Sequence, residues 1–142
     1  ANDVASLEQL LSSRLSFGTA GLRGVMGAGY NRMNDLVILQ TAQGLCEYLH
    51  SVFGEELKSR GIVIGYDHRA SGTLNSKGFA EITARVLLNE GIPVHMLHNE
   101  VATPFVAYGV RHTGSVAGVM VTASHNPKED NGFKVYWENG AQ

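Results

Sequence analysis

The 142-residue sequence has a single cysteine, Cys46, and no apolar run near the roughly 20 residues that a membrane-spanning helix needs. One cysteine excludes an internal disulfide and is typical of a reducing compartment. The first fifteen residues are polar and mixed, so they do not resemble a signal peptide. The 11 basic residues are scattered singly and the formal net charge is −2, which argues against a nucleic-acid-binding surface. We therefore expect a cytoplasmic protein with neither a nucleic-acid nor a membrane partner.

Several catalytic motifs are also absent from the chain. There is no G-x-x-x-x-G-K-[ST] phosphate loop, no G-x-S-x-G nucleophile elbow and no D-x-D-x-D run of aspartates. The spacing of His95 and His98 would place them on opposite faces of a strand, which argues against a metal-binding pair. These absences exclude the usual nucleotide-binding loop and argue against a serine hydrolase of the G-x-S-x-G type.

The residues that are present predict one layered α/β domain over 1–142. Hydrophobic residues make up 44% of the chain, enough for a sizeable core. Helical spacing of apolar residues predicts helices over 3–15, 35–53, 76–90 and 105–112. Their expected caps are Asp3, Asn34–Asp35, Ser76 and Thr103–Pro104. Apolar runs predict strands at 61–66, 92–97, 116–121 and 133–137, and the alternation favours a mostly parallel mixed sheet flanked by helices.

The most informative stretch is Thr122–Lys134, which follows the expected strand at 116–121 and runs into the one at 133–137. It is small and polar, contains Pro127, and has the turn-forming pair Asn131–Gly132. Catalytic groups are often held on such loops by a rigid scaffold. By chemistry alone, Ser124 is either a reactive hydroxyl or a turn hydroxyl bonded to backbone. In the same way, Lys134 is either a proton-handling group or a surface lysine on a strand.

Two further segments place charged residues near expected strand ends. The glycine-rich stretch 17–29 contains Arg23. Its planar guanidinium group could bind a phosphate through two hydrogen bonds or form a surface ion pair. The segment Asp67-His68-Arg69 directly follows a buried strand. Ligands bind beyond the carboxyl ends of parallel strands, so this segment is well placed. We interpret Asp67 and Arg69 as a structural pair that braces the Ser124 loop.

Three motifs together resemble the α-D-phosphohexomutase family, which includes phosphoglucomutase and phosphopentomutase. They are T-A-S-H-N-P at 122–127, N-G-F-K at 131–134 and F-G-T-A-G-L-R-G at 17–24. The residues at 18–21, 31–34 and 134–142 are most similar to the phosphoglucomutase–phosphopentomutase branch, which also includes glucose 1,6-bisphosphate synthase. Ala20 stands where phosphomannomutase-like members carry a tyrosine, which weakens a transfer of mannose specificity.

The resemblance implies a role for each of four residues. Ser124 would carry a phosphoryl group, Arg23 would stabilise it, and Lys134 would handle the proton of a sugar hydroxyl. His125 would hydrogen-bond near the sugar or orient the loop, whereas Asn126 and Asn131 would shape the loop. Arg23, Ser124, His125 and Lys134 are thus the predicted catalytic and substrate-binding residues. The phosphate on Ser124 would also supply one ligand to Mg²⁺, the expected metal.

The implied reaction interconverts a sugar 1-phosphate and a 6- or 5-phosphate through a bisphosphate. Glucose 1,6-bisphosphate would be the activator or intermediate, and sugar mono- and bisphosphates the binding partners. The alternatives are a glucose 1,6-bisphosphate synthase and a non-catalytic sugar-phosphate-binding homologue. The resemblance covers the first of four family domains. We therefore expect a fragment of a longer, monomeric protein, inactive without domains 2–4 and their aspartate metal loop.

Overall fold

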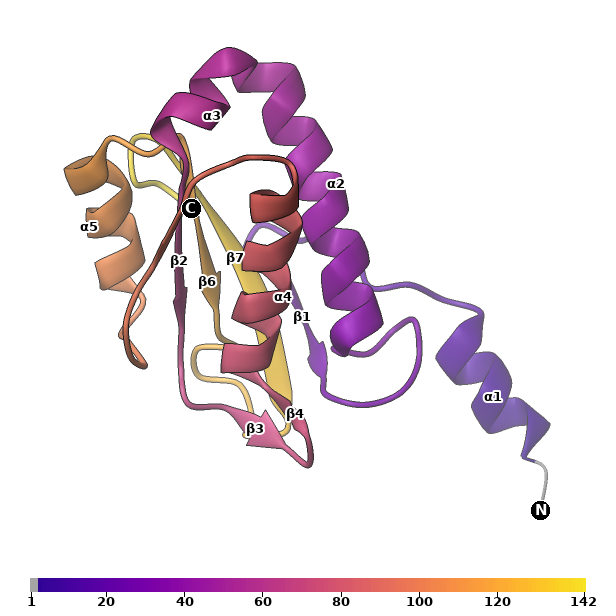
Figure 1. The fold of residues 1–142 in the computed structure, drawn as a ribbon. Coiled ribbons are helices and arrows are strands. Elements are labelled where there is room, and N and C mark those ends of the chain that lie inside the picture. The colour runs from indigo at the N-terminus through magenta and orange to yellow at the C-terminus, as the bar shows by residue number, and fades with distance from the viewer. Residues whose placement is uncertain (1–2) are drawn as a thin grey trace.

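The computed structural model describes residues 3–142 and is built on a five-stranded sheet with the order β1-β7-β6-β2-β5 (Figure 1). The strands are β1 (Leu22–Val25), β2 (Ile62–Tyr66), β5 (Val94–Met96), β6 (Ala117–Val121) and β7 (Asp130–Trp137). A separate small hairpin consists of β3 (Ala70–Ser71) and β4 (Leu74–Asn75). The predicted α/β fold with a mixed sheet is confirmed.

Parallel and antiparallel neighbours are equally represented in the sheet. β2 pairs in parallel with β5 and β6, whereas β7 pairs antiparallel with β6 and β1. The second antiparallel pair arises because β1, which was not among the predicted strands, forms within the glycine-rich stretch 17–29. Close approach explains the glycine just before this strand: a Cβ on Gly21 would lie 2.5 Å from the Phe133 carbonyl oxygen on β7.

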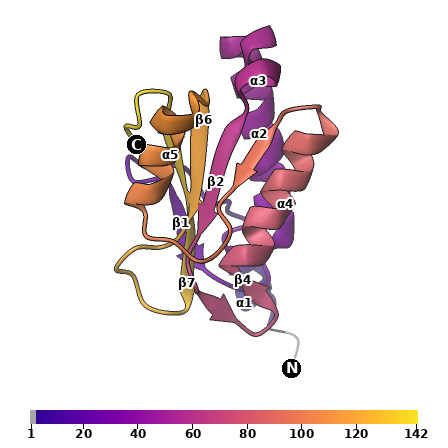
Figure 2. The same ribbon diagram turned by 60° about the vertical axis from the view of Figure 1, so that its left-hand side comes forward.

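Helices cover both faces of the sheet and make three layers (Figure 2). On one face lie α2 (Asp35–Phe53) and α4 (Ser76–Asn89), over the larger apolar core that includes the buried Cys46. On the other face, α5 (Pro104–Thr113) packs on a smaller cluster. This cluster consists of Val63, Val106, Val110, Met120 and Tyr136. An unpredicted short helix, α3 (Glu55–Arg60), follows α2 directly.

The helix ends agree with the sequence in part. Asn34 caps α2 by accepting a hydrogen bond from the Val37 N–H, as predicted. The cap of α4 is Asn75 rather than the predicted Ser76, because the Ser76 hydroxyl is bonded to Asp67 instead. Pro104 begins α5 as predicted, but Thr103 makes no side-chain cap bond to the helix.

The predicted N-terminal helix is shorter and more exposed than expected. It spans α1 (Val4–Leu11) and is capped by Asp3, but it buries none of its residues. Leu7 and Leu11 are each 53% exposed, and Figure 1 shows α1 standing away from the sheet. Its leucine face is therefore left largely uncovered by the described residues, although the Leu10 carbonyl accepts a hydrogen bond from the Tyr30 N–H at 2.9 Å. Among the helices of residues 3–142, none has the length and apolar character needed to cross a membrane.

Candidate active site

The serine loop, residues 122–129, connects β6 to β7 at the carboxyl end of β6. It is shorter than predicted because β7 begins at Asp130 rather than Phe133. Asn131 and Gly132 accordingly lie buried within β7, not in a turn. Since β2 and β6 are parallel neighbours, the serine loop and the segment after β2 meet at the same edge of the sheet.

Ser124 has a left-handed backbone, with φ of 60°, unlike every other non-glycine residue within 3–142. This conformation costs an ordinary residue about 1 kcal/mol, so its surroundings must hold it. The Ser124 N–H donates to Thr122 Oγ1 at 2.9 Å, and the Ser124 carbonyl accepts from Arg69 Nη2 at 2.9 Å. Both backbone groups of an exposed serine are thus held by neighbouring side chains.

Arg69 connects most of the serine loop to β2. Its Nη2 also donates to the Asn126 carbonyl, at 2.9 Å. Its Nη1 donates to the carbonyls of Pro127 at 2.7 Å and Asp130 at 3.0 Å, while Nε lies 3.2 Å from Asp67 Oδ2. The planar guanidinium matches this set of carbonyls because its donors project in one plane. The ion pair that we predicted between Asp67 and Arg69 is present, and its arginine contacts the loop directly.

Asp67 accepts hydrogen bonds from two hydroxyl groups that belong to different elements. Ser76 Oγ, at the start of α4, donates to Oδ1 at 2.6 Å, and Thr122 Oγ1 donates to Oδ2 at 2.6 Å. Asn131 Nδ2, on β7, donates in turn to Ser76 Oγ at 2.9 Å. Sequence reasoning missed Thr122 and Ser76 as members of this group. Thr122 could have been found from its place in the T-A-S-H-N-P motif, but no local pattern links Ser76 to Asp67.

Arg23 and Lys134 bring two positive charges to the base of the serine loop. Arg23 lies opposite Gly132 in the β1–β7 register, and Lys134 lies opposite Met120 in the β6–β7 register. Arg23 Nη1 donates to Asn126 Oδ1 at 3.1 Å, and its buried Nε has no protein partner. Lys134 is only 7% exposed. Burial, and then the nearby Arg23 charge, lower the pKa of Lys134.

His125 and Asn126 have different surroundings within the loop. The His125 side chain is exposed, as is Ser124, so a ligand can reach both. Asn126 is tied to Arg23 and also donates from Nδ2 to Asp130 Oδ2 at 2.9 Å. The structure therefore links Arg23 to the loop through Asn126 and places Lys134 near Arg23, and Asn126 has the loop-shaping contacts we expected.

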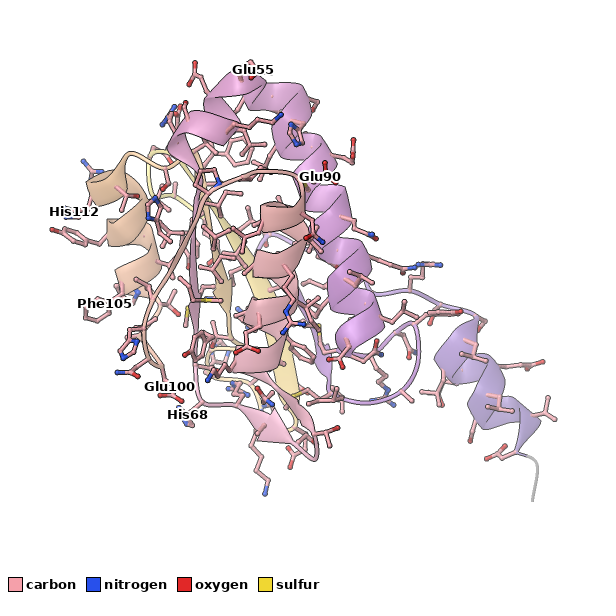
Figure 3. All side chains as sticks on the ribbon, in the orientation of Figure 1. Glu55, His68, Glu90, Glu100, Phe105 and His112 are labelled. Atoms are coloured by element: carbon pink, nitrogen blue, oxygen red, sulfur yellow. The ribbon has the colours of Figure 1, made fainter. Side chains whose placement is uncertain are left out.

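Ser124 lines two hollows. One, of about 420 Å³, is lined by Asp67, His68, Glu100, Val101, Ala102, Thr103, Met120, Thr122 and Ser124. The other, of about 450 Å³, is lined by Asp67, His68, Arg69, Ala70, Ser124, Asn126 and Lys128. Figure 3 shows His68 and Glu100 at this end of the molecule; neither was predicted as a site residue. Both volumes fall in the range of small-molecule sites.

A further hollow of about 540 Å³ has an unsuitable lining for a phosphate. It is bordered by α2, β7 and the segment before β1, with Tyr48 and Trp137 among its residues. None of its lining side chains is charged. The negative charge of a phosphorylated ligand therefore favours the hollow of about 450 Å³ beside Ser124, because Arg69 and Lys128 line it.

Metal-ligating groups are scarce near the serine loop. Within the part of the chain that the structure describes, no three His, Cys, Asp or Glu side chains are grouped to hold a metal ion. The Asp67 carboxylate is already used by the hydroxyls of Ser76 and Thr122 and by Arg69. This chain could thus offer a cation the oxygens of the serine loop, and the remaining ligands would have to come from elsewhere.

Comparison with known proteins relates this site to a defined enzyme family. The chain is 52% identical over 139 residues to mouse phosphopentomutase, an alignment that covers 96% of this chain and 22% of that protein. It is 52% identical over 138 residues to mouse glucose 1,6-bisphosphate synthase, with the same shares covered. Phosphoribomutase of Saccharomyces cerevisiae is 46% identical over 144 residues, covering 99% of this chain and 22% of the yeast protein. The chain thus spans about a fifth of the length of these relatives.

A solved structure and a family match agree with these relatives. The crystal structure of a candidate phosphomannomutase from Thermus thermophilus superimposes with a TM-score of 0.74 at 30% identity. The superposition covers 90% of this chain and 26% of the Thermus chain. Residues 14–142 match the family described as phosphoglucomutase/phosphomannomutase, alpha/beta/alpha domain I. With nearly all of its length matched, the chain belongs to this family of phosphomutase enzymes and has the fold of its first domain.

Proposed function

We propose that this chain is the phosphoserine-bearing first domain of a Mg²⁺-dependent sugar phosphomutase, with Ser124 as the phosphorylated residue. The observation that supports this most is the presentation of Ser124. Its side chain is exposed, its left-handed backbone is held by Thr122 and Arg69, and it lines two hollows. The similarity to phosphopentomutase and phosphoribomutase supports the same class of reaction.

In the proposed reaction, the phosphoryl group on Ser124 Oγ passes to a hydroxyl of a sugar monophosphate. The new P–O bond forms to the sugar oxygen as the bond to Oγ breaks, which yields a sugar bisphosphate. The bisphosphate turns over in the site and returns its other phosphoryl group to Ser124. Phosphoryl transfer of this kind depends on in-line positioning and on stabilisation of the oxygen charges.

The positively charged side chains near the serine loop can stabilise the negative charge of the phosphoryl oxygens. Arg23 is held near the loop by Asn126, and its buried Nε remains available as a donor. Lys134 has a lowered pKa because of its burial and the Arg23 charge, which makes proton exchange with a sugar hydroxyl easier than for an ordinary lysine. His125 is exposed on the same loop and would contact the sugar or its phosphate.

A phosphate on Ser124 would present the hard oxygen ligand that Mg²⁺ prefers. When bound, the ion would neutralise charge on the phosphoryl oxygens. Since residues 3–142 contain no cluster of three metal-ligating side chains, the other ligands would come from further domains of a longer protein. We accordingly propose that the isolated chain lacks mutase activity and that the full-length protein acts as a cytoplasmic monomer.

The sugar substrate would be a pentose or hexose phosphate, with glucose 1,6-bisphosphate as activator or intermediate. A second candidate activity is synthesis of glucose 1,6-bisphosphate from a separate phosphoryl donor. It is favoured by the identity to mouse glucose 1,6-bisphosphate synthase, which equals the identity to phosphopentomutase at 52%. Both activities would use Ser124 as the phosphoryl carrier.

Phosphopeptide mapping of the full-length protein tests the proposal. Exposure to glucose 1,6-bisphosphate should place one phosphate on the peptide that contains Ser124, and added sugar monophosphate should remove it. Ser124→Ala should abolish the label and activity, while Ser71→Ala, at an exposed serine on β3, should change neither. An unlabelled wild-type Ser124 together with full activity of Ser124→Ala would contradict the mechanism. Formation of sugar bisphosphate from 1,3-bisphosphoglycerate would favour the synthase.

A further inference from the structure

A chain of hydrogen bonds leads from the interior of the domain to the backbone of Ser124. Asn131 on β7 donates to Ser76 on α4, and Ser76 donates to Asp67 after β2. Thr122 donates to the other oxygen of Asp67 and accepts from the Ser124 N–H. Asn131 and Ser76 are fully buried and Thr122 is 3% exposed. Water is therefore a poor substitute for the partners of the Asn131, Ser76 and Thr122 side chains.

The direction of the bonds at Thr122 is determined by chemistry. An ionised carboxylate can only accept hydrogen bonds, so the single hydroxyl hydrogen of Thr122 must point to Asp67. The lone pairs of the same oxygen then remain for the Ser124 N–H. Asp67 thus orients the Thr122 hydroxyl as an acceptor, and this acceptor holds the N–H of the residue with φ of 60°.

We infer that Thr122 is a positioning residue for phosphoryl transfer, acting through the backbone of Ser124; this inference rests on the proposed function. Because Oγ is attached to Cβ, a rotation about φ of Ser124 moves the hydroxyl relative to the rest of the site. A misplacement of about 1 Å at a reacting atom can slow catalysis about a hundredfold. The hydrogen bond from Thr122 therefore sets where the phosphoryl group is carried, although Thr122 itself touches no reacting atom.

The chain contains a matched control for this role. Thr83, on α4, is also a fully buried threonine whose hydroxyl makes one well-formed bond, to the Phe79 carbonyl at 2.8 Å. Thr83 is not part of the Asp67 group. Thr122→Val and Thr83→Val each replace a buried hydroxyl by a methyl group of the same size, so general effects on stability should be similar. Thr122→Ser retains the hydroxyl and provides a conservative rescue.

The experiment compares these three variants in the full-length protein. For Thr122→Val we expect kcat, and the rate of Ser124 phosphorylation by sugar bisphosphate, to fall about tenfold or more, because both hydrogen bonds of the Thr122 hydroxyl are lost and with them the in-line geometry. KM for the sugar phosphate should change less than about threefold, because the substrate contacts remain. Thr122→Ser and Thr83→Val should keep rates close to the wild type. A Thr122→Val enzyme as fast as Thr83→Val would overturn the inference.

Hydrogen exchange separates this inference from the proposed function. In Thr122→Val, the peptide that contains the serine loop should exchange its amide hydrogens faster, and in Thr83→Val it should not. If wild-type Ser124 never takes a phosphate, the proposed function fails, and the positioning role for phosphoryl transfer fails with it. Faster exchange would then show only that Thr122 holds the loop. Should Thr122→Val not fold, Thr122→Ala removes the same hydroxyl with a smaller side chain, and an unchanged phosphorylation rate in that variant would overturn the inference.

Discussion

Lys134 is a charged side chain whose burial lowers the stability of the fold. It lies almost fully buried in β7, where its neighbour Phe133 belongs to the larger core. Burial favours the neutral amine, and the charge of Arg23 acts in the same direction, so the pKa of Lys134 lies below its ordinary value of 10.5. A lysine kept in such a place is a candidate for chemistry rather than for packing.

We predict that Lys134→Met raises the free energy of unfolding at neutral pH by about 1 kcal/mol, because it removes a buried charge. Below the folded-state pKa, wild-type Lys134 is charged in both the folded and the unfolded protein, so burial of the charge lowers the free energy of unfolding by its full amount. As the pH rises from that lowered pKa toward 10.5, the folded protein loses this proton before the unfolded chain does. The advantage of the variant should therefore shrink across this window.

Denaturant titrations of the wild type and Lys134→Met between pH 7 and pH 10.5 would measure this difference. Lys128→Met is the control, since the Lys128 side chain is 91% exposed. It should alter stability by less than about 0.5 kcal/mol at any pH. An advantage of Lys134→Met that grows with pH would show that the charge of Lys134 stabilises the fold.

At position 124, the effect of backbone strain on stability can be measured separately from the loss of the reactive hydroxyl. Its φ of 60° suits glycine but strains any residue with a Cβ. Ser124→Gly should therefore be more stable than Ser124→Ala by about 0.5–1 kcal/mol, although both variants lack the hydroxyl. Thermal unfolding of the two variants would measure the difference. If Ser124→Ala were the more stable of the two, the left-handed conformation would not be that of the folded protein.

At the scale of elements, one arginine holds the serine loop to the end of β2. Arg69 donates to four loop or strand carbonyls and pairs with Asp67, and its side chain is only 11% exposed. Lysine keeps the charge but cannot reproduce a planar set of donors. The contact between the loop and β2 therefore depends on the shape of the side chain as well as its charge.

We expect Arg69→Lys to lower the free energy of unfolding by about 2 kcal/mol, because several bonds to carbonyl groups are lost. Residues 122–129 should also become more sensitive to limited proteolysis. Arg85→Lys, at an exposed position on α4, is the control and should behave as the wild type. Equal stability and equal proteolysis of the two variants would mean that the four carbonyl contacts contribute nothing measurable.

For the molecule as a whole, stability resides in the sheet and the helices that cover it, not in α1. No residue of α1 is buried, whereas Leu49 of α2 is completely inaccessible to solvent. The double substitution Leu7→Gln and Leu11→Gln should change the free energy of unfolding by less than about 0.5 kcal/mol. Leu49→Ala should lower it by about 2–5 kcal/mol.

Chemical denaturation of the 142-residue chain would compare these variants. A large loss of stability from the α1 substitutions would show that Leu7 and Leu11 pack on the domain. The same pair of substitutions in the full-length protein would report whether α1 is covered by another part of it. A loss seen only in the longer protein would assign the exposed leucines to such a contact.

Local chemistry determined much of this protein from the sequence alone. The strands at β2 and β6 follow from uninterrupted apolar runs, and the ends of α2 follow from Asn34 and Gly54, because these signals act over a few neighbouring residues. The contiguous motif around Ser124 likewise marked the loop that the fold presents at the carboxyl end of β6.

Tertiary structure alone decided how distant residues combine. The strand β1 forms by pairing with β7, which is distant in the sequence. The Ser76 hydroxyl donates a hydrogen bond to Asp67 and does not cap its own helix. Asp67, Ser76, Thr122 and Asn131 come from four separate elements, so no spacing in the sequence relates them. The left-handed backbone of Ser124 depends on bonds from Thr122 and Arg69, and such a conformation is stable only where surrounding groups supply the energy to hold it.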